Sequence, residues 1–163
     1  MEKKIYYFLG SSVTYGFANN GKSFVEVIEK NLKCHCVKEA ENGTTLTDDD
    51  STSYVERLEN KLDKKEKIEG IIVQLSTNDI SKNKPLGEVS SSLEKDAFDK
   101  KTVLGAIEYI IAYCKEIWNC SVIFYTNPNF NNKKYDFSFT DGKGRQIILI
   151  YIVPLLIGLK MAD

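Results

Sequence analysis

The stretch Ile71-Ile72-Val73-Gln74-Leu75-Ser76-Thr77-Asn78-Asp79 changes abruptly from apolar to polar residues. Its first part, 71–75, is nearly continuous in apolar character, which is typical of a buried strand in a parallel sheet. The polar residues then fall in the loop at the carboxyl end of that strand, where open α/β sheets bind their ligands. The stretch therefore predicts a parallel sheet and also the edge of it at which a functional site lies.

The same alternation continues on both sides of this stretch. Short apolar runs predict strands, and apolar residues spaced three or four apart predict amphipathic helices between them. The expected strands are 5–9, 34–38 and 121–125, and the expected helices are 22–33, one on Val55, Leu58 and Leu62 capped by Ser51 or Thr52, and 103–114. Such alternation predicts right-handed βαβ units with helices on both faces. We expect one α/β domain with a five-stranded, mostly parallel sheet and a polar surface excursion over 81–101.

Three loops at the expected strand ends carry groups that suit acyl-transfer chemistry. The first, 10–16, reads Gly-Ser-Ser-Val-Thr-Tyr-Gly; alone it is more typical of an ordinary serine-rich turn than of a nucleophile loop. After the second strand, Gly43 lets the backbone approach a ligand and offers its N–H group. After the third strand, Asn78 offers a neutral amide donor. The backbone N–H of Ser12, that of Gly43 and the Asn78 side chain are therefore candidate oxyanion donors, with Ser12 as candidate nucleophile.

These blocks resemble those of the SGNH, or GDSL-type, hydrolases, in order and over about residues 4–128. Gly10-Ser11-Ser12 resembles the Gly-Asp-Ser block with Ser11 in place of Asp, Gly43 resembles the glycine of the second block, and 76–79 resembles Gly-x-Asn-Asp with Ser76 in place of Gly. The resemblance implies a three-layer α/β/α, flavodoxin-like fold. It also implies hydrolysis of acyl or carbohydrate esters, a small-molecule ester substrate, and chemistry that needs no metal or organic cofactor.

The fourth block of the family, Asp-x-x-His, is incomplete in this sequence. Asp163 is either the candidate triad aspartate or an ordinary exposed terminal residue. The single histidine, His35, stands near the start of the second strand, roughly 20 Å of extended chain from the expected active edge. We therefore expect a chain that lacks its general base and is inactive or weakly active, with an atypical, truncated or frame-shifted tail over 129–163 that includes the apolar run 147–159.

Two other functions remain open on the sequence alone. The first is a catalytically dead ligand-binding module that keeps the pocket without turnover. The second is a nucleotide-binding protein, because Gly16–Ser23 fits the P-loop pattern G-x-x-x-x-G-K-[ST] letter for letter. A P-loop glycine normally follows its strand directly, whereas the first strand ends several residues before Gly16. Ser23 with Glu26 also forms a capping box for the next helix.

Composition narrows the remaining classes of function. The 163 residues carry 22 basic and 23 acidic side chains, which gives a net charge of −1. This balance does not provide the excess of positive charge that favours binding to nucleic acid or to an anionic membrane. No apolar run reaches the roughly 20 residues of a membrane span, and no export signal precedes the first strand. We therefore expect a cytoplasmic protein with reduced cysteines. Cys34-His35-Cys36 lacks the further ligands of a metal site, and the oligomeric state stays open.

Overall fold

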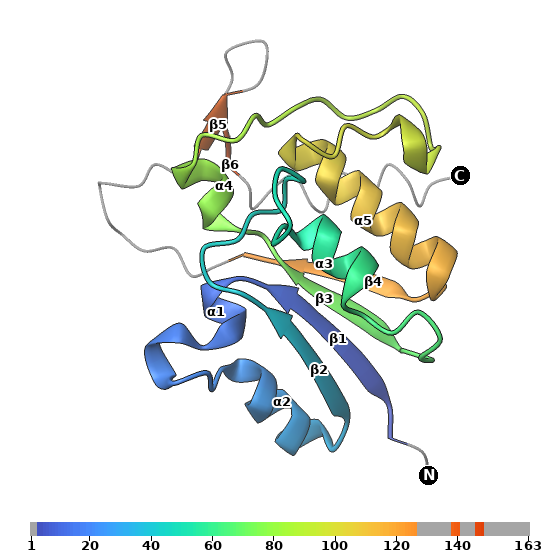
Figure 1. The fold of residues 1–163 in the computed structure, drawn as a ribbon. Coiled ribbons are helices and arrows are strands. Elements are labelled where there is room, and N and C mark those ends of the chain that lie inside the picture. Colours follow the sequence, from blue (N-terminus) through green and yellow to red (C-terminus); the bar gives the residue numbers. More distant parts are fainter. Residues whose placement is uncertain (1–2, 127–137, 141–145, 149–163) are drawn as a thin grey trace.

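Four parallel strands form the central sheet of the protein (Figure 1). The computed structural model describes residues 3–126, 138–140 and 146–148. The strands are β1 (Ile5–Gly10), β2 (His35–Ala40), β3 (Gly70–Gln74) and β4 (Ser121–Tyr125), in the order β2-β1-β3-β4. Every pairing is parallel, as the sequence predicts, and this order matches the first four positions of the flavodoxin-like order 2-1-3-4-5.

Helices cover both faces of the sheet and give three layers (Figure 1). They are α1 (Ser12–Tyr15), α2 (Phe24–Leu32), α3 (Tyr54–Asn60), α4 (Thr77–Ser81) and α5 (Val103–Ile117), with 3₁₀ turns η1 (Phe17–Asn19) and η2 (Lys95–Ala97). On one face the ring of Phe8 meets that of Phe24 of α2 edge to face, with centroids 6.0 Å apart. The other face packs against α3 and α5, so the expected three-layer α/β/α arrangement is confirmed.

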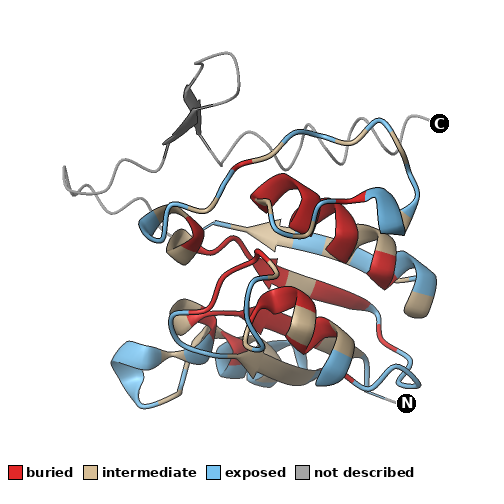
Figure 2. Cartoon of the chain, turned by 45° about the horizontal axis from the view of Figure 1, so that its top comes forward, coloured by how far each residue is buried: buried red, intermediate tan, exposed pale blue. Residues whose placement is uncertain are grey.

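The core lies between the sheet and the pair α3 and α5 (Figure 2). Because side chains alternate across a strand, Tyr7 and Leu9 of β1 point to the same face as Ile71 and Val73 of β3, with which they are paired in register. All four side chains are almost completely buried. Most of α5 is buried as well, because its apolar stripe faces the sheet.

Two helix starts show how polar side chains set the boundaries of the elements. At α2 the predicted capping box is confirmed: the Ser23 hydroxyl accepts from the Val25 N–H at 3.2 Å, and the Ser23 N–H donates to Glu26 at 2.6 Å. At α3 the predicted cap was wrong, because the cap is Ser53, whose hydroxyl accepts from the Glu56 N–H at 3.1 Å. Thr52 instead bonds the Asp50 carboxylate.

The segment after β4 departs from the expected five-stranded sheet. The described pieces β5 (Ser138–Thr140) and β6 (Gln146–Ile148) pair with each other antiparallel in a separate two-stranded sheet. Within the described residues the parallel sheet therefore has four strands; the rest of the expected tail, 129–163, lies outside them. The expected excursion over 81–101 is mostly irregular, but Leu86 and Phe98 anchor it in the core. No helix in the described part of the chain has the length and apolar character to cross a membrane.

Candidate active site

The three sequence-predicted loops all lie at the carboxyl edge of the sheet. Gly10, the last residue of β1, is level with Ala40, the last residue of β2, and the preceding residue Leu9 is level with Val73 of β3. Ser12 opens α1 directly after β1, Gly43 lies in the turn after β2, and Asn78 lies in α4 after β3. The parallel arrangement thus places all three at one edge.

Hydrogen bonds tie the loop after β2 to the loop after β3. The Thr44 carbonyl accepts from the Asn78 Nδ2 at 2.9 Å and from the Ser76 hydroxyl at 2.8 Å. The Gly43 carbonyl accepts from the Lys82 ammonium at 2.7 Å. Gly43 itself has φ +76°, a left-handed conformation that strains any residue with a Cβ. The bonds to the two carbonyls fix this turn beside α4, and the second Asn78 amide hydrogen has no acceptor among the described residues.

Several donors at this edge have no acceptor among the described residues. Among the described residues, none accepts a hydrogen bond from the Ser12 or the Gly43 N–H. The Ser12 side chain, half-buried, likewise bonds none of them. Two unpaired backbone N–H groups and an amide hydrogen at one sheet edge are the kind of donors that stabilise a developing oxyanion.

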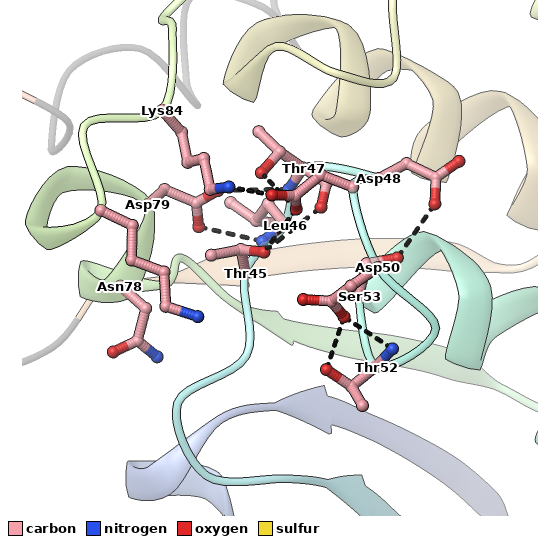
Figure 3. A network of polar contacts seen from close by, with 12 residues as sticks. Thr45, Leu46, Thr47, Asp48, Asp50, Thr52, Ser53, Asn78, Asp79 and Lys84 are labelled. Carbon is pink, nitrogen blue, oxygen red and sulfur yellow. Dashed lines mark hydrogen bonds and ion pairs between the residues drawn. The ribbon is translucent and has the colours of Figure 1, made fainter.

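The loop that follows Gly43 is held by hydrogen bonds to the buried carboxylate of Asp79 (Figure 3). Asp79 Oδ2 accepts from the Leu46 N–H at 2.9 Å, and Oδ1 accepts from the Thr47 N–H at 3.1 Å. Burial raises the pKa of Asp79, and these two N–H donors oppose the rise. Because Asp79 is the neighbour of Asn78, the carboxylate holds the Gly43 loop at a fixed place relative to the amide.

The buried guanidinium of Arg57 joins the carboxyl ends of β1 and β2. Its Nη2 donates to the Gly10 carbonyl at 2.9 Å and to the Thr44 hydroxyl at 3.0 Å, and its Nη1 donates to the Glu39 carbonyl at 3.1 Å and carboxylate at 3.3 Å. Arg57 is only 1% exposed. One side chain of α3 therefore fixes the loop that begins with Ser12 against the loop that contains Gly43.

A third buried polar residue, Gln74, contacts the loop of Ser12 directly. Gln74 Oε1 accepts from the Ser11 N–H at 3.0 Å and from the Thr14 N–H at 3.2 Å. The sequence pattern predicts no role for Gln74 or Arg57, and it includes Asp79 only as part of a motif. The available signal for Gln74 was its amide within an apolar strand, since buried polar groups require partners.

The remaining sequence-predicted residues lie elsewhere. His35, at the start of β2, pairs with Ile5 and so lies at the opposite edge of the sheet from Ser12. Its Nδ1 is 3.1 Å from the Glu29 carboxylate, in an exposed pair. Asp163 lies outside the described residues.

The Cys34 and Cys36 sulfurs lie 3.6 Å apart near the start of β2. Burial and the Cys34 thiol raise the pKa of Cys36 to about 12, so this thiol stays protonated at neutral pH. In the described ranges no cluster of three or more His, Cys, Asp or Glu side chains is arranged to hold a metal ion.

The segment Gly16–Ser23 does not have the structure of a P-loop. Gly16 follows helix α1 rather than a strand, and the residues after it form the turn η1. The Ser23 hydroxyl, which a P-loop would use for Mg²⁺, caps α2. The letter match is therefore a coincidence of residues that end one helix and start another, and the P-loop interpretation of this segment is wrong.

Solved structures with the same arrangement decide the fold. A protein described as a GDSL-like lipase from Bacteroides ovatus matches with a TM-score of 0.59 and 18% identity over 79% of this chain and 75% of its own. The fold is that of the SGNH, or GDSL-type, hydrolases. A similar GDSL-like protein from Bacteroides uniformis matches with a TM-score of 0.59 and 19% identity, over 79% of this chain and 72% of its own.

A family two carbohydrate esterase from Clostridium thermocellum, solved with cellohexaose, also shares this SGNH-type fold. It has a TM-score of 0.58 and 17% identity, over 81% of this chain but 45% of its own length. Another structure, 24% identical with a TM-score of 0.61, is covered over 57% of its length, so this chain spans only about half of some of its structural neighbours. No protein-family model matches the sequence, and no curated protein matches it.

Proposed function

We propose that this SGNH-type chain is the scaffold of a serine ester hydrolase that acts on small acyl or carbohydrate esters. The observation that supports this most is the meeting of the Ser12, Gly43 and Asn78 loops at the carboxyl edge of β1, β2 and β3, with donors left unpaired by the described residues. The GDSL-like and carbohydrate-esterase neighbours supply the substrate class.

In the proposed reaction the Ser12 hydroxyl oxygen attacks the acyl carbon of the ester and loses its proton to a base. The ester carbonyl oxygen takes the negative charge and accepts hydrogen bonds from the Ser12 N–H, the Gly43 N–H and the remaining Asn78 amide hydrogen. The alcohol then leaves, and water hydrolyses the acyl-serine. Lys82 and the Ser76 hydroxyl take no part in bond making, but they hold the carbonyls next to the donors in place.

The general base is the missing part of this scheme. The only histidine of the 163 residues, His35, lies at the wrong end of β2, and Asp163, outside the described part, is the proposed carboxylate that would orient a base. Oxyanion stabilisation and binding without a triad leave roughly 10³–10⁴-fold acceleration over water. We therefore expect the 163-residue polypeptide to turn over p-nitrophenyl acetate slowly; rapid turnover that disappears in Ser12→Ala would contradict this expectation.

Exogenous imidazole allows the serine assignment to be tested in the same polypeptide. We expect imidazole to accelerate labelling of Ser12 by a fluorophosphonate, because it supplies a base of suitable pKa that can diffuse to the site. Labelling is located by mass spectrometry of peptides. Ser12→Ala abolishes it, whereas the matched variant Ser11→Ala, which removes a buried hydroxyl without a hydrogen-bond partner among the described residues, retains it.

Three results would overturn parts of the proposal. Equal labelling of Ser12→Ala, or labelling at another serine, would refute Ser12 as the nucleophile. Labelling of Ser12 at the same high rate with and without imidazole would mean that the polypeptide supplies its own general base, and it would refute the expectation that the base is missing. Tight binding of an ester analogue with no labelling under any condition would favour the second candidate, a catalytically dead ligand-binding module, for which the absence of a histidine from the carboxyl edge is the supporting observation.

A further inference from the structure

A chain of buried and partly buried hydrogen bonds runs from the end of β4 to the first turn of α1. The Tyr125 hydroxyl is 2.5 Å from the Thr14 Oγ1, which is 2.7 Å from the Gln74 Oε1. Thr14 and Gln74 are both completely buried. The chain thus joins β4 and β3 to the short helix that carries Ser12.

The direction of each hydrogen bond in this chain follows from the chemistry of the groups. Two backbone N–H groups, those of Ser11 and Thr14, point at the same Gln74 atom, so that atom must be the amide oxygen. The oxygen only accepts, so the single hydroxyl proton of Thr14 goes to it. Tyr125 must then donate to Thr14. Burial raises the pKa of Tyr125 to about 12, so the phenol keeps the proton that it donates.

Gln74 therefore holds Ser12 from both sides along the backbone. It binds the N–H of the residue just before Ser12 and the N–H and hydroxyl of Thr14 just after it. The approach is close because Gly10 has no side chain: a Cβ there would lie 1.8 Å from the Thr14 Oγ1 and 2.9 Å from the Gln74 Oε1. These contacts hold the first turn of α1 in one orientation. The backbone N–H and the side chain of Ser12 are oriented with that turn.

We propose that Gln74 is a positioning residue for Ser12, and that Thr14 and Tyr125 extend its action to the carboxyl end of β4. Gln74 does not touch the substrate in this proposal. It sets the direction of the Ser12 N–H and hydroxyl by fixing the peptide groups around them. The inference rests on the proposed function of Ser12, but it names a residue that positions Ser12 from β3, through a hydrogen bond between Thr14 and Gln74 that spans 60 residues of sequence.

The main test compares rates of imidazole-dependent phosphonylation of Ser12. Displacement of a reacting group by about 1 Å costs up to roughly 100-fold in rate, so we expect Gln74→Met to slow labelling about 10- to 100-fold. Thr14→Val, which deletes the hydroxyl, is expected to slow labelling about tenfold, while Thr14→Ser, which keeps it, recovers most of the rate.

Tyr125→Phe tests the far end of the chain, and Tyr109→Phe is its matched control. Both variants delete one phenol oxygen; the Tyr109 hydroxyl donates to Glu59 at 2.6 Å, between α5 and α3, and is not part of the chain of bonds that reaches α1. We expect slower labelling in Tyr125→Phe and the wild-type rate in Tyr109→Phe. Equal rates in these two variants would overturn the part assigned to Tyr125.

Backbone amide hydrogen exchange separates this inference from the proposed function. In wild type the Ser11 and Thr14 amides should be protected, and Gln74→Met should expose both, because their acceptor is gone. If wild type is labelled and Gln74→Met is labelled at the same rate, the positioning role of Gln74 is overturned and the proposed function stands. Unlabelled wild type would overturn the proposed function, while unprotected Ser11 and Thr14 amides in wild type would overturn the hydrogen-bond chain itself.

Discussion

Replacement of Arg57 by leucine tests whether a buried cation holds the carboxyl edge together. The guanidinium donates to the carbonyls of Gly10, Glu39 and Thr52, to the Thr44 hydroxyl and to the Glu39 carboxylate. Gly10 keeps a second donor, the Glu41 N–H at 3.2 Å, but the Thr52 carbonyl and the Glu39 carboxylate lose the donor that Arg57 supplies. A buried acceptor left without a donor costs about 1–3 kcal/mol, and removal of one partner of a buried ion pair costs about 3–5 kcal/mol.

We therefore expect Arg57→Leu to lower the free energy of unfolding by about 3–5 kcal/mol, a large share of the roughly 5–15 kcal/mol of a typical domain. The assay is urea denaturation followed by tryptophan fluorescence from Trp118, which packs on the ring of Tyr7 in the core. The control is Lys4→Met, which breaks an exposed ion pair with Glu69 and should cost under about 1 kcal/mol.

A loss below about 1 kcal/mol for Arg57→Leu, with an unchanged denaturant slope, would refute this account of the site. Should the leucine variant fail to fold, Glu39→Gln provides a milder perturbation of the same group. Its amide oxygen still accepts from Arg57 while the charge is removed, so we expect a loss of about 1 kcal/mol. Glu39→Gln with wild-type stability would mean that the Glu39 carboxylate adds nothing to the cluster.

Two further predictions concern other carboxylates. Asp79→Asn should lower stability by about 1–3 kcal/mol in urea denaturation at pH 7, because an amide offers one acceptor to the two N–H groups of Leu46 and Thr47; unchanged stability would show that the 44–49 loop does not depend on it. Although burial acts in the opposite direction, hydrogen bonds from Lys38 and the Ser23 N–H lower the pKa of Glu26 to about 2. Its stabilisation is therefore complete above about pH 4.5 and lost as the pH falls toward 2. Since Glu26 is 43% exposed, screening leaves about 1 kcal/mol, so Glu26→Gln should be less stable than wild type by that amount at pH 7 and equal to it near pH 2, whereas a gap independent of pH would contradict the assignment.

The strands and helices could be predicted because two signals agree: the spacing of apolar residues along each element, and the capping or turn residues at its ends. Ile71 and Val73 lie in the core as their strand pattern predicts, and Ser23 with Glu26 begins α2 as the capping box predicts. The cap of α3 was missed because several hydroxyls compete at 51–53, and only the fold decides that the Ser53 hydroxyl reaches the helix.

The placement of the Ser12, Gly43 and Asn78 loops at one edge followed from parallel topology, but their supports did not. Gln74 binds Ser11, which is 63 residues away in the sequence, and Arg57 binds Gly10, which is 47 residues away. No local pattern encodes such partners. A buried amide or guanidinium signals only that acceptors and donors must exist nearby in space. The catalytic roles themselves stay predictions that the labelling experiments test.

The missing side chain at Gly10 has a consequence for how related sequences diverge. Residues 10, 14 and 74 fill one volume, since even a methyl group at position 10 would overlap the Thr14 hydroxyl. Single exchanges that add a side chain at position 10 should therefore be purged, while a compensated pair, such as alanine at 10 with glycine at 14, should survive. In a deep mutational scan this triplet should appear as one epistatic unit, and a library that varies position 10 alone should recover almost only glycine.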